Sequence, residues 1–385
     1  MIVILIFSIL LFFCYAGLLL FYRQCWVSIP NFPASDGGKT KISVIIPARN
    51  EAENIGHCLD SIKGQTYPAQ LFEVVVVDDH SEDRTSDIIS GYGGNIRCIK
   101  LADHVDADLN SYKKKAIEIG IENSNGQLIV TTDADTCRSE KWLGTIAAFY
   151  ESNQPVFIAA PVVINCSNSF FEKFQALDFM MLQGITGAAV HRKFHNMCNG
   201  ANLAYEKKAF TAVDGFKGID NIASGDDMLL MHKIDKTFPD KIMYLKSKEV
   251  IVSTNAAKSF KEFFNQRIRW ASKADKYADK SLFPVLLIVY LFNLSLLVLP
   301  IFAIFSNYQL SIANCQLQIL CLWLLLLAFK CIIELFLLFP VASFFGKTKM
   351  LWQFPLMQPF HIIYTIIAGW LGKFGSYKWK GRKVK

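Results

Sequence analysis

The stretch Val74-Val75-Val76-Val77-Asp78-Asp79 decides the fold class of this chain. Four consecutive valines, with no polar residue among them, predict a strand buried on both faces, as in a parallel sheet covered by helices. The strand ends in a pair of carboxylates. Because open α/β sheets bind their ligands at the carboxyl ends of the strands, we expect Asp78 and Asp79 to line a crevice.

The same pattern occurs a second time, at residues 128 to 132. This apolar, β-branched run is followed directly by Asp133-Ala134-Asp135. Carboxylates that share a crevice favour a hard divalent cation with oxygen ligands, which could bridge to a diphosphate on a substrate. The sequence therefore predicts a metal-assisted reaction at this edge of the sheet.

Helical patterns separate the predicted strands. Lys41 to Ile46 is a further strand, and we expect a helix after it with Asn50 as its cap. Ser81 to Ile89 and Lys113 to Glu122 also have helical patterns. This alternation predicts a mostly parallel, Rossmann-like α/β sheet. The sequence has no Gly-x-x-x-x-Gly-Lys-Ser/Thr or Gly-x-Gly-x-x-Gly loop, so metal and side chains would have to hold the phosphates.

The composition indicates membrane segments in addition to this domain. The chain has 385 residues, of which 52% are hydrophobic, and its mean hydropathy of +0.28 is too high for an ordinary soluble protein. Ile2 to Tyr22 is long enough to span a bilayer. Because it lacks a preceding basic residue and a small-residue cleavage site, we expect an uncleaved anchor.

Further apolar runs after residue 281 complete the expected organisation. We expect a transmembrane anchor at residues 1–22, a linker at 23–39, a globular domain at 40–280, a membrane region at 281–372 and a basic cytoplasmic tail at 373–385. The membrane region would contain helices at about 282–305 and 317–345 and a last apolar segment at about 351–372.

Basic residues predict which parts of the chain face the cytoplasm, because cytoplasmic loops are enriched in lysine and arginine. Such residues occur at Arg23, Lys273, Lys276, Lys280, Lys347 and Lys349 and throughout the tail. If the Lys347 loop and the tail are both cytoplasmic, residues 351–372 cannot cross the bilayer once. The polar and proline residues in that segment, Pro355, Gln358, Pro359 and His361, favour a re-entrant or interface-lying segment over a crossing.

The charge and the cysteines narrow the range of partners. Much of the net charge of +7 lies in the juxtamembrane tail, so membrane lipids are the expected partner and nucleic acid is not. The ten cysteines form no Cys-x-x-Cys pair, which argues against a structural zinc site and suits a reduced, cytosolic domain.

Two segments leave alternatives open. Lys330 and Glu334 lie four residues apart in an apolar run, which predicts a compensating buried pair with a structural role or a place along an acceptor path. Phe170 to Leu182 suits either an amphipathic helix at the membrane surface or ordinary core packing.

Two further motifs follow along the chain, Ser224-Gly225-Asp226-Asp227 and Gln266-Arg267-Ile268-Arg269-Trp270. In this order and at these separations, the four motifs resemble those of membrane-bound family 2 glycosyltransferases with a GT-A fold. The resemblance covers the chain from the anchor to the last membrane segments. It implies a hexosyltransferase with a GT-A domain at residues 40–280, in a multi-pass protein of a bacterial inner membrane with the catalytic domain in the cytoplasm.

The resemblance also implies which residues bind the donor, a nucleotide sugar such as a UDP-sugar. The nucleoside pocket would be formed by Pro47, Ala48, Arg49, Glu51, Asp78 and Asp79. Lys113 would lie near the nucleotide, but Tyr112 stands where a glycine is expected, which leaves Lys114 and Lys115 as alternatives. Asp135 would bind Mg²⁺ or Mn²⁺ directly, and Asp133 would contact the donor.

On the acceptor side, the resemblance implies that Asp227 is the catalytic base, with Asp226 as the alternative. Arg269 would bind the diphosphate and Trp270 would lie under the acceptor sugar, with Gln266 in the same motif. Asn199 and Gly200 match an acceptor-proximal loop. A single carboxylate base without a carboxylate nucleophile implies direct displacement with inversion of the anomeric centre.

The expected acceptor is a lipid or a lipid-linked glycan. One alternative is a processive polysaccharide synthase, for which three carboxy-terminal apolar stretches are few. An alternative of another class is a non-catalytic membrane scaffold or transporter component. The sequence does not specify the sugar, the linkage or the oligomeric state.

Overall fold

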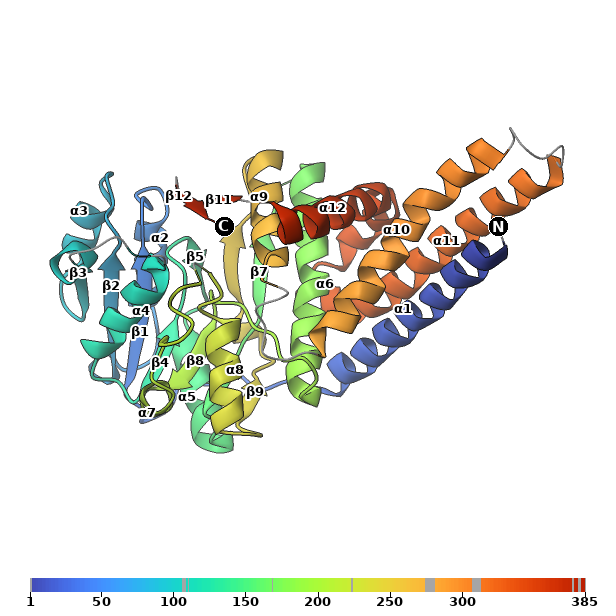
Figure 1. Cartoon of the computed structure of the whole chain (residues 1–385). Coiled ribbons are helices and arrows are strands. Elements are labelled where there is room, and N and C mark those ends of the chain that lie inside the picture. The colour runs from blue at the N-terminus through green and yellow to red at the C-terminus, as the bar shows by residue number, and fades with distance from the viewer. Residues whose placement is uncertain are drawn as a thin grey trace. The chain divides into compact units, whose positions relative to one another are not determined.

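The computed structural model describes residues 2–105, 109, 111–167, 169–222, 224–273, 281–306, 313–375, 377–379 and 382–384. Lys276 and Lys280 of the predicted basic patch lie outside these residues. The described chain divides into two compact units (Figure 1). The sheet unit comprises Ile29–Cys166 and Ala189–Ala256, and the helical unit comprises Met1–Ser28, Ser167–Ala188 and Ala257–Lys385.

A mixed sheet forms the centre of the sheet unit. Within the described residues it has seven strands in the order β3-β2-β1-β4-β8-β6-β9. Their bounds are β1 Ile42–Ala48, β2 Phe72–Asp78, β3 Ile96–Lys100, β4 Leu128–Thr131, β6 Phe157–Ala159, β8 Leu203–Glu206 and β9 Ile242–Tyr244. The β3-β2-β1-β4 half is parallel, and β8 runs antiparallel to both β4 and β6. The predicted mostly parallel α/β sheet is therefore confirmed.

The strand that first indicated this fold lies in the middle of the parallel half. Val74 to Val77 are completely buried, which explains why the run contains no polar residue. Ala48 pairs with Asp78 in the parallel register, so β1 and β2 end together at the acids. A smaller sheet contains β5 (Thr136–Cys137), β10 (Val252–Asn255) and β7 (Val162–Asn165). Its strand β5 begins directly after Asp135 of the second acid pair.

The helices of the sheet unit are α2 (Ile55–Lys63), α3 (Thr85–Ser90), α4 (Tyr112–Glu122), α5 (Trp142–Asn153), α7 (Lys207–Ala212) and α8 (Met228–Thr237). Two of them begin later than predicted. Asn50 does not cap α2, because it has a left-handed φ of 52° and accepts a hydrogen bond from the Glu82 amide at 2.9 Å. Its own amide donates to the Ser81 hydroxyl at 3.0 Å. These side chain to backbone bonds replace the first helical turns with two interlocked loops.

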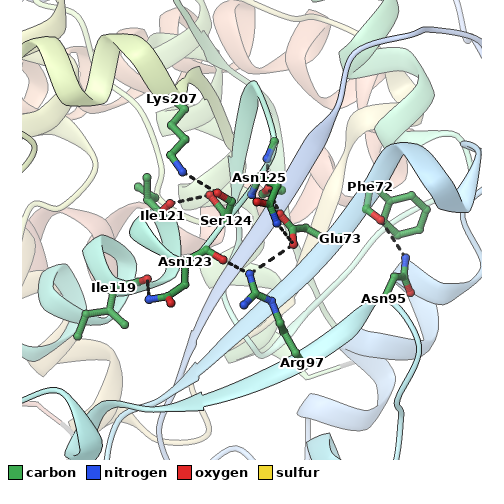
Figure 2. A network of polar contacts seen from close by, with 12 residues as sticks. Phe72, Glu73, Asn95, Arg97, Ile119, Ile121, Asn123, Ser124, Asn125 and Lys207 are labelled. Atoms are coloured by element: carbon green, nitrogen blue, oxygen red, sulfur yellow. Dashed lines mark hydrogen bonds and ion pairs between the residues drawn. The ribbon is translucent and has the colours of Figure 1, made fainter.

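A polar network ties the strands together at the end of the sheet opposite the acids (Figure 2). The Glu73 carboxylate accepts hydrogen bonds from the Asn125 amide and from the Ser43 hydroxyl, the latter at 2.7 Å. Arg97 donates to the Asn123 carbonyl and lies 3.4 Å from Glu73. Burial alone would raise the pKa of Glu73, but these hydrogen bonds and the Arg97 charge outweigh it and lower the pKa. The network joins β1, β2, β3 and the turn before β4.

The helical unit contains α1 (Ile2–Ser28), α6 (Phe170–Arg192, up to Ala188), α9 (Phe260–Ala271), α10 (Leu282–Ser306), α11 (Ala313–Phe344) and α12 (Phe354–Phe374), followed by a hairpin of β11 (Tyr377–Trp379) and β12 (Arg382–Val384). Helices α1, α10 and α11 pack side by side (Figure 1). Among the described residues, four helices are long and apolar enough to cross a membrane, at Val3–Ser28, Leu282–Ile304, Leu317–Phe344 and Thr348–Phe374. The apolar segments at both ends of the chain are therefore helical, as predicted.

Two boundaries differ from the expected organisation. Helix α1 continues to Ser28 and so includes the first residues of the segment expected to be a linker. Most of α6 groups with the apolar helices instead of with the sheet, although it lies within the predicted globular domain.

In the apolar helices, Lys330 and Glu334 form the predicted buried pair, with 2.6 Å between Nζ and Oε1.

Candidate active site

The first acid pair lies where β2 ends. Asp78 and Asp79 are buried, and the Asp79 amide donates to the Ala48 carbonyl at the end of β1 at 2.8 Å. Arg49 donates to the Asp79 carbonyl at 3.1 Å and lies 3.7 Å from its carboxylate. His80 contacts the same carboxylate at 2.9 Å. Residues from β1 and β2 that were assigned to the nucleoside pocket thus lie together.

The loop that contains Glu51 is fixed by the loop after β2. The Glu51 amide donates to the Thr85 hydroxyl at 2.8 Å, and the Ala52 amide donates to Asp83 at 3.0 Å. Thr85 is completely buried and begins α3. The two loops therefore form one structure at the carboxyl ends of β1 and β2, next to Pro47 and Ala48 in sequence.

Lys113 connects the second acid pair with the Gly-Asp-Asp motif. Its ammonium lies 2.8 Å from Oδ1 of Asp133 and 3.1 Å from Oδ2 of Asp226. Burial would lower the pKa of Lys113, but the charges of Asp133, Asp226 and Asp227 outweigh it and raise the pKa above its ordinary value of 10.5. The side chain consequently stays protonated throughout the neutral range.

The neighbouring lysines point elsewhere. Lys114 is buried and donates to the carbonyls of Ile219 at 2.6 Å and Ile222 at 2.7 Å. Lys115 pairs with Glu118 at 2.7 Å on the surface of α4. Of the three lysines that the sequence left open, Lys113 is therefore the one that lies among the acids, while Lys114 holds the loop that leads toward Asp226.

Asp135 lies at the start of the small sheet and is partly exposed. Its Oδ2 accepts a hydrogen bond from Thr254 at 3.2 Å. Sequence patterns did not identify Thr254, because it reaches the site through the pairing of β10 with β5, which joins residues far apart in the chain. Among the described residues, no group of three or more His, Cys, Asp or Glu side chains could hold a metal by itself.

The acceptor-side motif contains two carboxylates with different contacts. Asp227 caps α8: its Oδ1 accepts from the Met228 amide at 2.8 Å and its Oδ2 from the Gly200 amide at 3.2 Å. Asp226 instead faces Lys113. A side chain at Gly200 would lie 3.3 Å from Asp226 Oδ2 and 3.6 Å from Lys113 Nζ, so the small residue permits this close approach. Asn199 holds the loop by accepting from the Ala201 amide at 2.9 Å.

Apart from the nucleoside residues and Asp135, the predicted residues fall into two groups. The sheet unit brings together Lys113, Asp133, Asn199, Gly200, Asp226 and Asp227, which we call the acid cluster. Gln266, Arg269 and Trp270 lie on α9 in the helical unit, where each is partly exposed.

A mixed sheet with acids at the ends of β2 and β4 places carboxylates where α/β sheets bind their ligands. Residues 43–213 match the family model described as Glycosyl transferase family 2. This part of the chain is therefore similar to family 2 glycosyltransferases, and the mixed sheet resembles a GT-A fold, as the motifs predicted.

Individual relatives resemble parts of the chain. Glycosyltransferase AglE of Haloferax volcanii is 37% identical over 102 residues, which cover 26% of this chain and 33% of AglE. Probable glycosyltransferase YdaM of Bacillus subtilis is 24% identical over 253 residues, 63% of this chain and 57% of YdaM. The chain thus spans less than two thirds of the length of these relatives.

A solved structure resembles nearly the whole chain. Mannosyltransferase PcManGT of Pyrobaculum calidifontis, in complex with GDP-Man and Mn²⁺, has a TM-score of 0.57 and 17% sequence identity. The match covers 93% of this chain and 99% of that chain. At this identity, the likeness concerns the fold.

Proposed function

We propose that this protein transfers a hexose or N-acetylhexosamine from a nucleotide sugar, UDP-linked in the first instance, to a lipid or lipid-linked glycan at the cytoplasmic face of a membrane. The observation that supports this most strongly is the acid cluster. It places the Lys113 ammonium between the carboxylate that follows β4 and the carboxylate before α8. Donor-side and acceptor-side groups are thereby within one network of contacts.

Different donor residues would bind different parts of the nucleotide. Asp78 and Asp79 would accept hydrogen bonds from the base or ribose, with Arg49, Glu51, Pro47 and Ala48 beside them. Asp133 would contact the donor, and the Lys113 charge would stabilise the diphosphate as negative charge develops on it. Because Lys113 is fixed by Asp133 and Asp226 before any ligand binds, little reorganisation would be needed during the reaction.

The residues present fit a divalent metal. Asp135 offers a partly exposed carboxylate, and hard oxygen ligands suit Mg²⁺ or Mn²⁺. Such ions are often held by one or two carboxylates together with substrate phosphates, which agrees with the small number of acids here. Asp135 would hold the ion, with Asp133 next to it. When bound, the metal would supply additional charge neutralisation for the leaving diphosphate.

Asp227 is the better candidate for the base that accepts the proton of the acceptor hydroxyl. Its two backbone hydrogen bonds fix the direction of the carboxylate, and each oxygen retains a further lone pair. Asp226 is the alternative, but its contact with Lys113 suits a role in positioning that lysine. One base acting without a carboxylate nucleophile implies inversion at the anomeric carbon.

Helix α12 supports a location at the membrane. One face exposes apolar side chains at alternating spacings of four and three residues, Leu356, Phe360, Ile363, Ile367, Trp370 and Phe374. The other face is buried and includes Gln358, whose side chain accepts a hydrogen bond from Lys330 and donates one to Glu334. The exposed apolar face suits contact with lipid, and we keep the interface-lying helix as the proposal because of the prolines and polar residues in this segment. Gln266, Arg269 and Trp270 on α9 would meet the diphosphate and the acceptor sugar.

The proposal is tested with purified full-length protein in nanodiscs and a panel of UDP- and GDP-sugars. We expect one nucleotide sugar to raise the melting temperature in the presence of Mn²⁺ and to be hydrolysed slowly without acceptor, with both effects abolished by chelator. Octyl glucoside then serves as a simple acceptor that joins a sugar to an alkyl chain. A single radiolabelled product would support one transfer per acceptor, whereas a ladder of products would contradict it.

A further inference from the structure

Three residues on one face of α6 contact either α9, which contains the Gln-x-x-Arg-Trp motif, or the segment that leads into α9. Gln175, Asp178 and Phe179 follow the i, i+3, i+4 spacing of a single helical face. The Gln175 side chain donates to the Ala257 carbonyl at 3.1 Å and accepts from the Ala257 amide at 2.9 Å. Ala257 lies just before Ser259, the capping residue of α9, so this amide fixes the point where the chain enters α9.

The second of these residues forms a buried ion pair with α9. Oδ2 of Asp178 lies 2.7 Å from a terminal nitrogen of Arg267, and the two residues are 6% and 4% exposed. On α12, Tyr364 donates a hydrogen bond to Oδ1 of Asp178, and His361 lies 3.8 Å from the same oxygen. A buried carboxylate with these partners is held in one position, and α6, α9 and α12 are joined through it.

The third contact concerns the orientation of Trp270. The Arg267 guanidinium lies 4.3 Å from the centre of the Trp270 ring and 4.8 Å from that of Phe263. None of its side-chain nitrogens makes a hydrogen bond among the described residues, so the guanidinium is held by the charge of Asp178 and by the aromatic rings. Phe179 also packs against Trp270, with 6.0 Å between the centres of the two rings. Arg267 is thus held on one side by Asp178 and on the other by the indole.

We propose that Asp178 is a positioning residue for the acceptor: by holding Arg267, it fixes the orientation of the Trp270 ring and with it the acceptor subsite. This inference rests on the proposed function, in which Trp270 contacts the acceptor sugar. Arg267 occupies one of the two variable positions of the Gln-x-x-Arg-Trp motif, and Asp178 lies outside all four motifs. An arginine buried against aromatic rings needs its carboxylate, because an unpaired buried charge is strongly unfavourable. Removal of that carboxylate should therefore displace Arg267 and release the indole.

The test compares Asp178→Asn with Glu172→Gln in full-length protein in nanodiscs. Glu172 is a matched control on the same helix, where it accepts from the Ser167 amide instead of contacting α9. Acrylamide quenching of Trp270, obtained as the difference from Trp270→Phe in each background, measures the freedom of the indole without any substrate. We expect stronger quenching in Asp178→Asn and no change in Glu172→Gln.

Transfer to octyl glucoside supplies the second measurement. We expect the acceptor KM to rise about tenfold to a hundredfold in Asp178→Asn, because small misplacements cost rate and affinity on this scale. The donor KM and acceptor-independent donor hydrolysis should stay unchanged. If Asp178→Asn fails to fold, Arg267→Lys takes its place, since it keeps the charge but loses the planar stacking, and it should show a smaller increase in both measurements.

Unchanged quenching and unchanged acceptor KM in the folded variant would overturn this inference. If the wild-type protein transfers no sugar at all, the proposed function fails instead, and the quenching comparison still decides whether Asp178 positions Trp270.

Discussion

The acid cluster of the sheet unit and the polar network of the helical unit both place a lysine among oxygen atoms, but they differ in how far they are closed. Lys113 lies 2.8 Å from Asp133 and 3.1 Å from Asp226, and all three side chains are partly exposed. Lys330 lies 2.6 Å from both Glu334 and Gln358, and it is 0% exposed.

The contacts of Gln358 favour a structural role for the second network over a place along an acceptor path. Its Nε2 donates to Glu334 Oε2 at 2.6 Å, and Tyr15 of α1 donates to Oε1 of the same carboxylate. Lysine, glutamate and glutamine therefore satisfy each other and link α1, α11 and α12. In the acid cluster, exposed carboxylate oxygens retain lone pairs for a ligand. Charge alone therefore does not distinguish a proposed binding site from a structural network. The two differ in the exposure of their side chains and in whether their polar atoms already bond to one another.

The largest effect should come from Asp227→Asn. If Asp227 is the base, kcat falls by about 10² to 10⁴, while nucleotide binding is retained, because the asparagine oxygen can still accept from one backbone amide. Rates are measured by single-turnover transfer to octyl glucoside. Asp226→Asn is the paired variant, and a greater loss of kcat there than in Asp227→Asn would assign the base to Asp226.

Glu334→Leu should cause the next largest effect, on stability. A buried lysine left without its carboxylate costs about 3–5 kcal/mol, so the melting temperature in nanodiscs falls sharply. The double variant Lys330→Met with Glu334→Leu removes both charges and should regain most of the loss. A double variant as unstable as the single one would show that the network stabilises the helices through more than charge pairing.

Lys113→Met should reduce kcat/KM by about 10² to 10³, the scale expected when one fixed electrostatic group is removed from a reacting centre. Lys115→Met is the matched control, because Lys115 lies on the same helix and pairs with Glu118 on the surface. Equal activities of the two variants would mean that the lysine among the acids has no role in transfer.

The smallest effect should come from Glu73→Gln at the opposite end of the sheet. The pKa of Glu73 is lowered in the folded protein, so its stabilising contribution is present above its ordinary value of 4.5 and is lost as the pH falls through the folded pKa. Glu73→Gln should therefore lower stability by about 1 kcal/mol at neutral pH.

The pH dependence supplies the check on this last prediction. The difference in melting temperature between wild type and Glu73→Gln should shrink as the pH drops below that ordinary value. Glu118→Gln, which removes a surface partner of Lys115, should change little at any pH. A constant difference for Glu73→Gln would exclude ionisation of this carboxylate as the cause.

Local patterns were sufficient to predict β1, β2 and β4 and the acids that follow β2 and β4. An unbroken run such as Val74 to Val77 has one stable environment, and the residue after it must lie at the strand end. The predicted starts of α2 and α3 were wrong because they depend on contacts between segments that are distant in the sequence. Asn50 and Ser81 bond to each other's loops, and such contacts between distant segments leave no periodic trace in the sequence.

The choice among the lysines and the role of Asp178 also depended on distant contacts. Adjacent residues on a helix point about 100° apart, so only the placement of α4 shows that Lys113 faces Asp133 while Lys114 faces Ile219. Asp178 lies in a helix that suited either core or membrane surface. Its partners Arg267 and Tyr364 come from two other helices, and no spacing connects them.

Nucleotide binding tests the central claim most directly. UDP and GDP are titrated into full-length protein in nanodiscs by calorimetry, with Mn²⁺ and with chelator, for wild type, Asp135→Asn and the control Glu118→Gln. We expect one nucleotide to bind wild type and Glu118→Gln in the presence of Mn²⁺, and its binding to be abolished by chelator and by Asp135→Asn. Equal binding by all three proteins, with or without metal, would contradict a metal-assisted nucleotide-sugar site at the ends of β2 and β4.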